Sequence, residues 1–281
     1  MQQQTLILIH CKDAVGLVSK LSHVVAKHEL NIITMREYVD EENNRFFVRL
    51  VCSGEPDNPE ELVTDLEERL PEHAEITVNP IQKKKIVILV TKEHHCLADI
   101  MVRQYFDTLQ ADVAAVIGNY DDLAEFTRKF DVPFHCISHE RKHKDDFEAE
   151  LAEKINSYEP DYVILAKFMR ILSPNFVKQF ENKLINIHHS FLPAFIGANP
   201  YRQALQRGVK MIGATAHYVT NDLDEGPIIA QDIKKIDHSH DLARMKTMGK
   251  EVEKAVLIRA IQLLMEDRVM LNGNKTIVFK S

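Results

Sequence analysis

Several features are missing from this sequence, and each absence excludes a class of protein. No run of apolar residues approaches the ~20 residues that a membrane-spanning helix needs. The first residues, MQQQTLILIHCKD, contain neither a basic segment nor a long apolar core, so they do not resemble a secretion signal. The cysteines Cys11, Cys52, Cys96 and Cys136 form no close pairs, and we therefore expect reduced thiols in a cytoplasmic protein.

The chain also lacks an excess of positive charge and an internal repeat. Its formal net charge is −7 and its isoelectric point is about 6.1, which argues against a nucleic-acid or membrane-surface partner. No period of ~20–50 residues recurs, so a repeat architecture is excluded. The remaining composition, 281 residues with 45% hydrophobic and 27% charged, is that of a globular protein with two domains.

Residues 1–82 have the pattern of a small α+β domain. The expected elements, in order, are a strand at Thr5–Cys11, a helix after Gly16, strands at Ile32–Val39 and Phe46–Cys52, a helix at Pro59–Leu70 and a strand at Glu75–Val78. The order strand, helix, strand, strand, helix, strand in about eighty residues predicts a ferredoxin-like sandwich.

The turn after the first strand resembles that of the ACT regulatory domain. The resemblance lies in Asp13, Gly16 and Leu17, followed by Asn31, although the family usually has proline where this chain has Val15. It implies that these four matching residues bind an amino-acid effector, and that sheet edges pair between subunits of a homodimer or homotetramer. A dimerisation module without a ligand is the alternative.

Residues 83–281 are expected to form a second domain with a mostly parallel, Rossmann-like sheet. The lysines of Ile81–Lys85 indicate a solvated linker, and Ile86–Val90 is then typical of a fully buried parallel strand. Further apolar runs at Val113–Ile117, Phe134–Ile137 and Asp161–Ala166 alternate with helical segments, which favours a parallel α/β sheet.

Polar residues follow two of these predicted strands where the strands end. Lys167–Ser173 comes directly after one strand, and Asn186 and His188 stand two residues apart on the next. Residues i and i+2 of a strand share a face, and ligands of open α/β sheets bind beyond the carboxyl ends of the strands. A later apolar run carries His217 and leads into an acidic turn around Asp224. Such a set is suited to carbonyl chemistry, which needs donors for an oxyanion and a carboxylate that moves protons.

Four motifs in this half resemble the folate-dependent formyltransferase family. They are FMRILS at 168–173, NIHHSFLP at 186–193, GATAH at 213–217 and DLDEGP at 222–227. The resemblance implies that Asn186, His188 and Asp224 carry the chemistry. It also implies that the folate is bound by Phe168, Met169, Arg170, Ile171 and Leu172, with His217 and Gly226. His217 would touch the site or hydrogen-bond Asp224, and simple packing is the alternative.

One difference within that family favours hydrolysis over formyl transfer. Glycinamide ribonucleotide formyltransferases have a glycine-rich loop after their first strand, whose N–H groups bind the acceptor's phosphate. Here residues 91–97 are TKEHHCL, without glycine, and His95 and Cys96 are expected to fill that pocket. With an ACT-like domain in front, the chain resembles the deformylase branch, which hydrolyses 10-formyltetrahydrofolate to tetrahydrofolate and formate. Ile196 departs from the lysine that the family usually has.

Hydrolysis of the formamide at N10 requires an oxyanion stabiliser, a base for water and an acid for N10. We hypothesise that His188 and Asn186 stabilise the oxyanion while Asp224 orients water and moves protons, without a metal or redox cofactor. Formyl transfer to an amine remains an alternative, as does an amino-acid sensor with an inactive second domain. A metal-dependent deformylase is a further alternative, because His139–His143 matches H-E-x-x-H, but its polar surroundings predict a loop.

Overall fold

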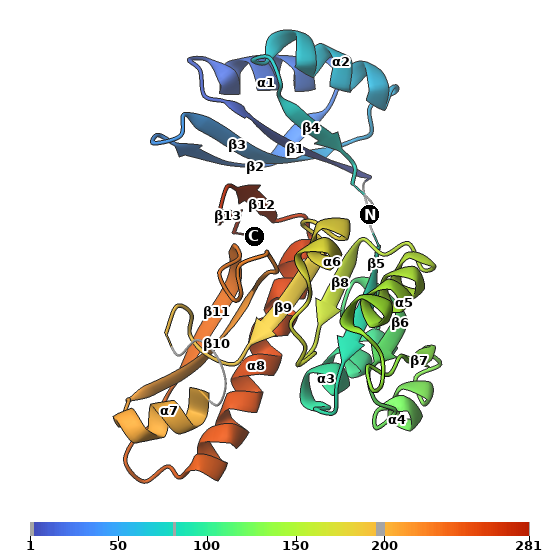
Figure 1. Ribbon diagram of the computed structural model, residues 1–281. Helices are drawn as coiled ribbons and strands as arrows, with labels where there is room; N and C mark the ends of the chain where they lie inside the picture. Colours follow the sequence, from blue (N-terminus) through green and yellow to red (C-terminus); the bar gives the residue numbers. More distant parts are fainter. Residues whose placement is uncertain (1–2, 81–82, 195–199, 281) are drawn as a thin grey trace. The chain divides into compact units, whose positions relative to one another are not determined.

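The computed structural model describes residues 3–80, 83–194 and 200–280, and the chain divides into two compact units (Figure 1). The first unit comprises Met1–Gln82 with Asp267–Asn272 and Ile277–Ser281, and the second comprises Lys83–Glu266 with Gly273–Thr276. The sequence assigned all of residues 83–281 to the second domain. That assignment is corrected for the C-terminal segments, because residues such as Met270 and Phe279 pack against Phe47 of the first unit's sheet.

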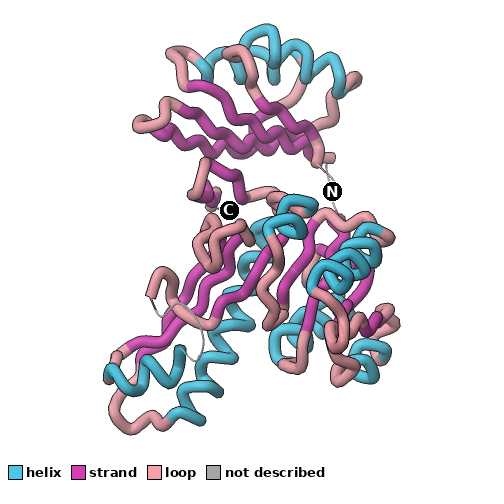
Figure 2. The backbone as a smooth tube through the Cα atoms, in the orientation of Figure 1, coloured by secondary structure: helices cyan, strands magenta, loops and turns pink. Residues whose placement is uncertain are grey.

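The first unit is the expected ferredoxin-like sandwich. Its elements are β1 (Gln4–Lys12), α1 (Leu17–Lys27), β2 (Asn31–Asp40), β3 (Arg45–Ser53), α2 (Pro59–Arg69) and β4 (Glu75–Val78). The antiparallel sheet has the order β2-β3-β1-β4, and both helices cover one face of it (Figures 1 and 2). Buried residues alternate along β1 with a period of two, so that one set of side chains packs against the helices.

The second unit is built on a seven-stranded sheet with the order β11-β10-β9-β8-β5-β6-β7. Its elements are β5 (Lys84–Val90), α3 (His95–Tyr105), β6 (Ala111–Gly118), α4 (Ala124–Arg128), β7 (Phe134–Cys136), α5 (Lys144–Asn156), β8 (Tyr162–Leu165), α6 (Pro174–Gln179), β9 (Leu184–His188), α7 (Pro200–Arg207), β10 (Met211–Tyr218), β11 (Ile228–Lys235) and α8 (Leu242–Met265). The neighbouring pairs β7–β6, β6–β5, β5–β8 and β8–β9 are parallel, whereas β10 is antiparallel to both β9 and β11. The predicted mostly parallel sheet is therefore confirmed. The C-terminal β12 (Val269–Asn272) and β13 (Lys275–Val278) pair with each other in a separate two-stranded sheet.

Strand register in the second unit brings the predicted site residues together near the carboxyl ends of β8 and β9. In the parallel pair β8–β9, Leu165 lies opposite Asn186, so the segment after β8 and the end of β9 meet there. In the antiparallel pair β9–β10, His217 lies opposite Asn186 and Thr215 opposite His188. These registers explain why residues about thirty positions apart can act on one ligand.

The lysines at the start of the second unit are not all solvated. Lys84 already belongs to β5 and is buried, with its ammonium donating a hydrogen bond to the carbonyl of Met265 at 3.2 Å. The expectation of a solvated linker was therefore wrong for this residue, because a buried amine is tolerated once it finds an acceptor. Ile81 and Gln82 lie outside the described residues. None of the helices in the described ranges is long and apolar enough to cross a membrane.

Candidate active site

A cavity of about 1290 Å³ lies in the second unit where β8 and β9 end. The segment after β8, the end of β9, the acidic turn after β10 and one face of α8 all contribute to its lining. Asn186, His188, His217 and Asp224 are among the residues that line it, so the structure brings the predicted catalytic residues together in one place. A cavity of this size can hold a ligand much larger than water.

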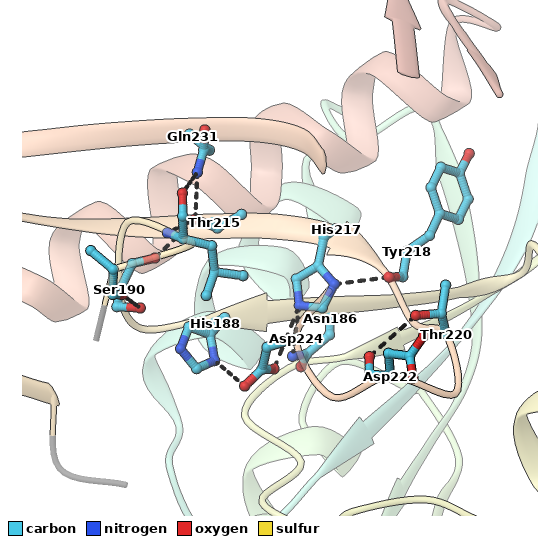
Figure 3. Close-up of polar contacts among 12 residues, drawn as sticks. Asn186, His188, Ser190, Thr215, His217, Tyr218, Thr220, Asp222, Asp224 and Gln231 are labelled. Carbon is cyan, nitrogen blue, oxygen red and sulfur yellow. Dashed lines mark hydrogen bonds and ion pairs between the residues drawn. The ribbon is translucent and has the colours of Figure 1, made fainter. Parts of the chain in front are cut away.

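His188 and Asp224 are paired with each other at the centre of the site (Figure 3). The distance from Nδ1 of His188 to Oδ2 of Asp224 is 3.3 Å, and both side chains are more than nine-tenths buried. Burial pushes the pKa of Asp224 upward, but the hydrogen bond from His188 and the charges of His188, His217 and His189 hold it below its usual range. Among the described residues none pairs with Nε2 of His188, which leaves that nitrogen available to a ligand.

Asn186 is oriented by His217 on the neighbouring strand. Nδ1 of His217 donates to the carbonyl of Tyr218 at 2.8 Å, and burial lowers the pKa of this imidazole. In the neutral ring the other nitrogen, Nε2, is an acceptor, and Nδ2 of Asn186 lies 3.3 Å from it. Nε2 lies 3.8 Å from Oδ1 of Asp224, so of the roles considered for His217 its hydrogen bond goes to Asn186 while its ring lines the cavity. His217 therefore fixes the direction of the amide.

The acidic turn that carries Asp224 depends on two backbone features. Asp224 has φ 59°, in the left-handed region that aspartate tolerates better than most residues. A Cβ at Gly226 would lie 1.8 Å from the carbonyl oxygen of Tyr218, so only glycine allows this close approach. Gly226 does not line the cavity. Its position indicates that it shapes the turn rather than contacting a ligand.

The loop after His188 is held by a hydrogen-bond network that the sequence analysis missed. The hydroxyl of Thr215 donates to the carbonyl of Ser190 at 2.9 Å and accepts from the amide of Leu192 at 3.0 Å. The amide of Gln231 donates to the Leu192 carbonyl at 3.0 Å and to the Thr215 hydroxyl at 2.9 Å (Figure 3). A threonine and a glutamine inside apolar strands were the available signal, because buried polar groups are almost always bonded.

An apolar wall of the cavity follows β8. Met169 and Ile171 are 58% and 66% exposed although they are large and apolar, whereas the preceding Phe168 is buried in the core. Arg170 and Leu172 also line the cavity, as the sequence predicted for this segment. Two anchors hold the segment in place: the amide of Met169 donates to Oγ1 of Thr91 at 3.1 Å, and Glu148 of α5 accepts from the amide of Ser173 at 2.9 Å.

Comparisons with known proteins agree with both halves of this architecture. A formyl transferase family model matches residues 84–261 and an ACT domain model matches residues 5–70. The formyltetrahydrofolate deformylases of Haemophilus influenzae and Bacillus subtilis are 48% and 41% identical to this chain; the alignments cover 99% and 97% of it and 100% and 93% of theirs. The chain belongs to the formyltetrahydrofolate deformylase family.

Solved structures show how much of this deformylase-family chain is shared with deformylases and with transformylases. A formyltetrahydrofolate deformylase from Pseudomonas syringae has a TM-score of 0.92 at 39% identity, and the match covers 99% of this chain and 94% of that one. A glycinamide ribonucleotide transformylase from Symbiobacterium toebii has a TM-score of 0.68 at 29% identity, and the match covers 72% of this chain and 96% of that one. The transferase thus shares most of the second unit's fold, and the deformylase nearly the whole chain.

The structure separates the two residues that were expected to fill an acceptor pocket in this deformylase-family chain. His95, the first residue of α3, is buried and lines the cavity, with Nε2 2.8 Å from Oε2 of Glu253. Cys96 is buried but does not line the cavity, and burial raises the pKa of its thiol. Ile196, the departure from the family pattern, lies outside the described residues.

Among the described residues, one group has the donors and spacing of a metal site: His95, Cys96 and Glu253, with donor atoms within 4.8 Å of one another. The ammonium of Lys167 lies 3.1 Å from Oε2 of Glu253, so a cation already neutralises this carboxylate. The H-E-x-x-H match at His139–His143 is a turn in which Arg141 has φ 59°. Its two histidines therefore do not share a helix face, as that motif requires.

The residues predicted to bind an effector lie at the start of the first unit. Gly16 caps α1 with φ 84°, and a Cβ there would meet nothing within 4 Å, so the glycine serves the backbone angle. Asp13 lies in the same turn, and Asn31 begins β2 with its side chain exposed. Leu17 is a core residue of this unit, packed with the buried residues of the sheet. Effector binding here stays a prediction.

Proposed function

We propose that this protein hydrolyses 10-formyltetrahydrofolate to tetrahydrofolate and formate. The observation that carries the proposal is the convergence of Asn186, His188 and Asp224 on one cavity, in a chain that is 48% identical to a named deformylase over nearly its full length. Folate and the amino-acid effector are the proposed small-molecule ligands, the latter at the ACT unit. No step of the reaction below calls on a metal or a redox cofactor.

The chemical step begins with water at the formyl carbon. The carboxylate of Asp224, which is ionised because its pKa is lowered, takes a proton from the water as the new C–O bond forms. The formyl oxygen becomes an oxyanion that accepts hydrogen bonds from the Asn186 amide and from Nε2 of His188. When both ring nitrogens of His188 carry a proton, Nδ1 donates to Asp224 and Nε2 donates to the oxyanion.

The second half of the reaction releases the folate. The proton held by Asp224 passes to N10, the C–N10 bond breaks, and the tetrahedral species collapses to formic acid, which loses its proton as formate. The exposed apolar side chains of Met169 and Ile171 support the binding of a flat ring system, because an aromatic ligand would remove both from water.

A turnover assay with product identification tests the proposal. Purified protein with 10-formyltetrahydrofolate and no amine should release tetrahydrofolate and formate in equal amounts. Asp224→Asn keeps the shape of the side chain but removes the base, and we expect kcat to fall by about 10²–10³ with folate affinity nearly unchanged. Asp222→Asn is the matched control, since Asp222 is an exposed acidic residue of the same turn that does not line the cavity. Parent turnover in Asp224→Asn, or no formate from the parent protein, would refute the proposal.

A further inference from the structure

A buried cluster beside the catalytic residues has no part in the steps above. Glu253 of α8 is 1% exposed, and its carboxylate accepts a hydrogen bond from the hydroxyl of Tyr201 at 2.6 Å on Oε1. Oε2 lies 2.8 Å from Nε2 of His95 and 3.1 Å from Nζ of Lys167. We call these four residues the Glu253 cluster. They come from α8, α7, α3 and the end of β8, so the cluster joins the elements that surround the cavity.

The carboxylate at the centre of the cluster is ionised and is held by three donors of the protein itself. Burial pushes the pKa of Glu253 upward, but the hydrogen bond from His95, the charge of Lys167 and the hydrogen bond from Tyr201 lower it to about 2. A carboxylate only accepts, so Nε2 of His95 must be the donor in that contact. The three internal donors therefore occupy most of the acceptor positions that Glu253 would otherwise offer to a ligand.

Two backbone features maintain this arrangement. Lys167 has φ 64°, in the left-handed region that a lysine rarely adopts, and this conformation accompanies the contact of its ammonium with Glu253. Gly249 lies one turn before Glu253 on α8, and a Cβ there would be 2.0 Å from the hydroxyl oxygen of Tyr201. Glycine at this helical position is what allows the tyrosine to reach the carboxylate.

The cluster and the catalytic residues face the same cavity. All four cluster residues line it, together with Asn186, His188 and Asp224. His189 lies between the two groups, with ring centroids 5.2 Å from His188 and 5.9 Å from Tyr201. Burial and the charge of Lys167 lower the pKa of His189 to about 4, so this ring is neutral near pH 7. The neutral His189 ring therefore offers no charge that would bind an amine acceptor between the two groups.

We propose that the Glu253 cluster determines the acceptor of the reaction by closing the cavity to amines and leaving water as the nucleophile. The inference rests on the proposed hydrolysis. An amine acceptor must reach the formyl carbon as the neutral amine with its N–H groups hydrogen-bonded, and a buried carboxylate without internal partners would accept from them. Here the carboxylate is bonded internally, and the His95 and Tyr201 side chains occupy the space beside it. Water is smaller than an amine acceptor, and it reaches the formyl carbon without a contact to the Glu253 carboxylate or the space that His95 and Tyr201 occupy.

Formyl transfer is the reaction that the cluster would prevent, and its balance is simple. The amine nitrogen bonds to the formyl carbon, the C–N10 bond breaks, the amine loses one proton and N10 gains one. The products are an N-formyl amine and tetrahydrofolate, in place of formate and tetrahydrofolate. The ratio of N-formyl amine to formate therefore reports the choice of acceptor independently of the overall rate.

The test measures that ratio with glycinamide as the probe amine and a formyl-labelled folate. His95→Ala removes a donor and a ring from the cluster, while Gly249→Ala displaces Tyr201 without touching any catalytic residue. We expect both to raise the ratio of N-formylglycinamide to formate by about 10-fold or more over the parent protein. His135→Ala is the matched control, because His135 also has a single short hydrogen bond, 2.6 Å to Tyr158, but does not line the cavity. Its ratio should equal that of the parent.

The outcomes separate this inference from the proposed function. If the parent protein releases no formate, the proposed hydrolysis itself is refuted. A parent that hydrolyses, with two folded variants whose ratios equal the parent's, overturns the role of the cluster alone. Folded variants that form neither product also overturn it, because the cluster would then be needed for chemistry rather than for the choice of acceptor. Using two variants from opposite sides of Glu253 keeps the test decisive if one of them fails to fold.

Discussion

Replacing Gly226 with alanine should damage catalysis although Gly226 does not line the cavity. A Cβ there would lie 1.8 Å from the carbonyl oxygen of Tyr218, and real Cβ contacts essentially never fall below 3.0 Å. The turn must therefore shift by about 1.2 Å, and Asp224 is only two residues away. A misplacement of ~1 Å in a catalytic constellation costs ~10² in rate, so we expect kcat for formate release to fall by about 10²-fold. Overpacking should also lower the free energy of unfolding by about 1–3 kcal/mol.

The control for this experiment is Gly208, where an added Cβ has open space around it. Gly208 has φ 63°, and a Cβ there would meet nothing within 4 Å. Gly208→Ala should therefore cost only the ~1–2 kcal/mol of a left-handed conformation, with kcat unchanged. Steady-state kinetics and urea unfolding of both variants make the comparison. If Gly226→Ala has the parent's kcat, then the turn does not position Asp224 and the assignment of that carboxylate loses its structural basis.

Two further predictions concern stability and folate binding. The pKa of Glu253 is lowered from 4.5 to about 2 on folding, so its paired carboxylate contributes on the order of 3 kcal/mol above pH ~4.5, and this is lost as the pH falls to about 2. Urea unfolding should show Glu253→Gln to be less stable than the parent at pH 7, with the gap closing toward pH 2; a gap independent of pH would contradict the lowered pKa. Ile171→Ser removes apolar area that a bound folate would cover, and we expect KM to rise about 10-fold with kcat unchanged, whereas an unchanged KM would place the folate elsewhere.

The fold could be predicted from local patterns wherever the pattern and the element coincide. The helix expected at Pro59–Leu70 is found at Pro59–Arg69, because Pro59 occupies its first turn and the Asn58 side chain caps the amides of Glu60 and Glu61. The alternation of apolar strands and helices in the second half likewise predicts the parallel sheet. What local patterns cannot give is the partner of a distant segment, and so the packing of Met270 and Phe279 with Phe47 was not anticipated.

The residues of the candidate site were likewise predictable where a local pattern marks them and not where distant segments meet. Asn186 and His188 were found because two residues of one strand share a face, which is a local property. Tyr201 and Glu253 were missed because each is an ordinary residue of its own segment, and Lys167 was placed at a strand end without its partner Glu253. Their shared role is visible only where four elements converge. No spacing rule links an α8 glutamate to a tyrosine of α7.

The catalytic residues are positioned in two ways, by strand register and by a turn, and we expect substitutions in the two to have different effects. Asn186 and His217 are opposite each other in the register of β9 and β10, so backbone hydrogen bonds on both strands fix their separation. Asp224 has no such support, since it lies in a turn whose course depends on its own φ of 59° and on the absence of a side chain at Gly226. Because a strand register cannot shift by a fraction of a residue, substitutions in β9 or β10 should lower stability before they misalign the amide. A turn can shift by an ångström at little cost, so substitutions there should lower kcat while the protein stays folded.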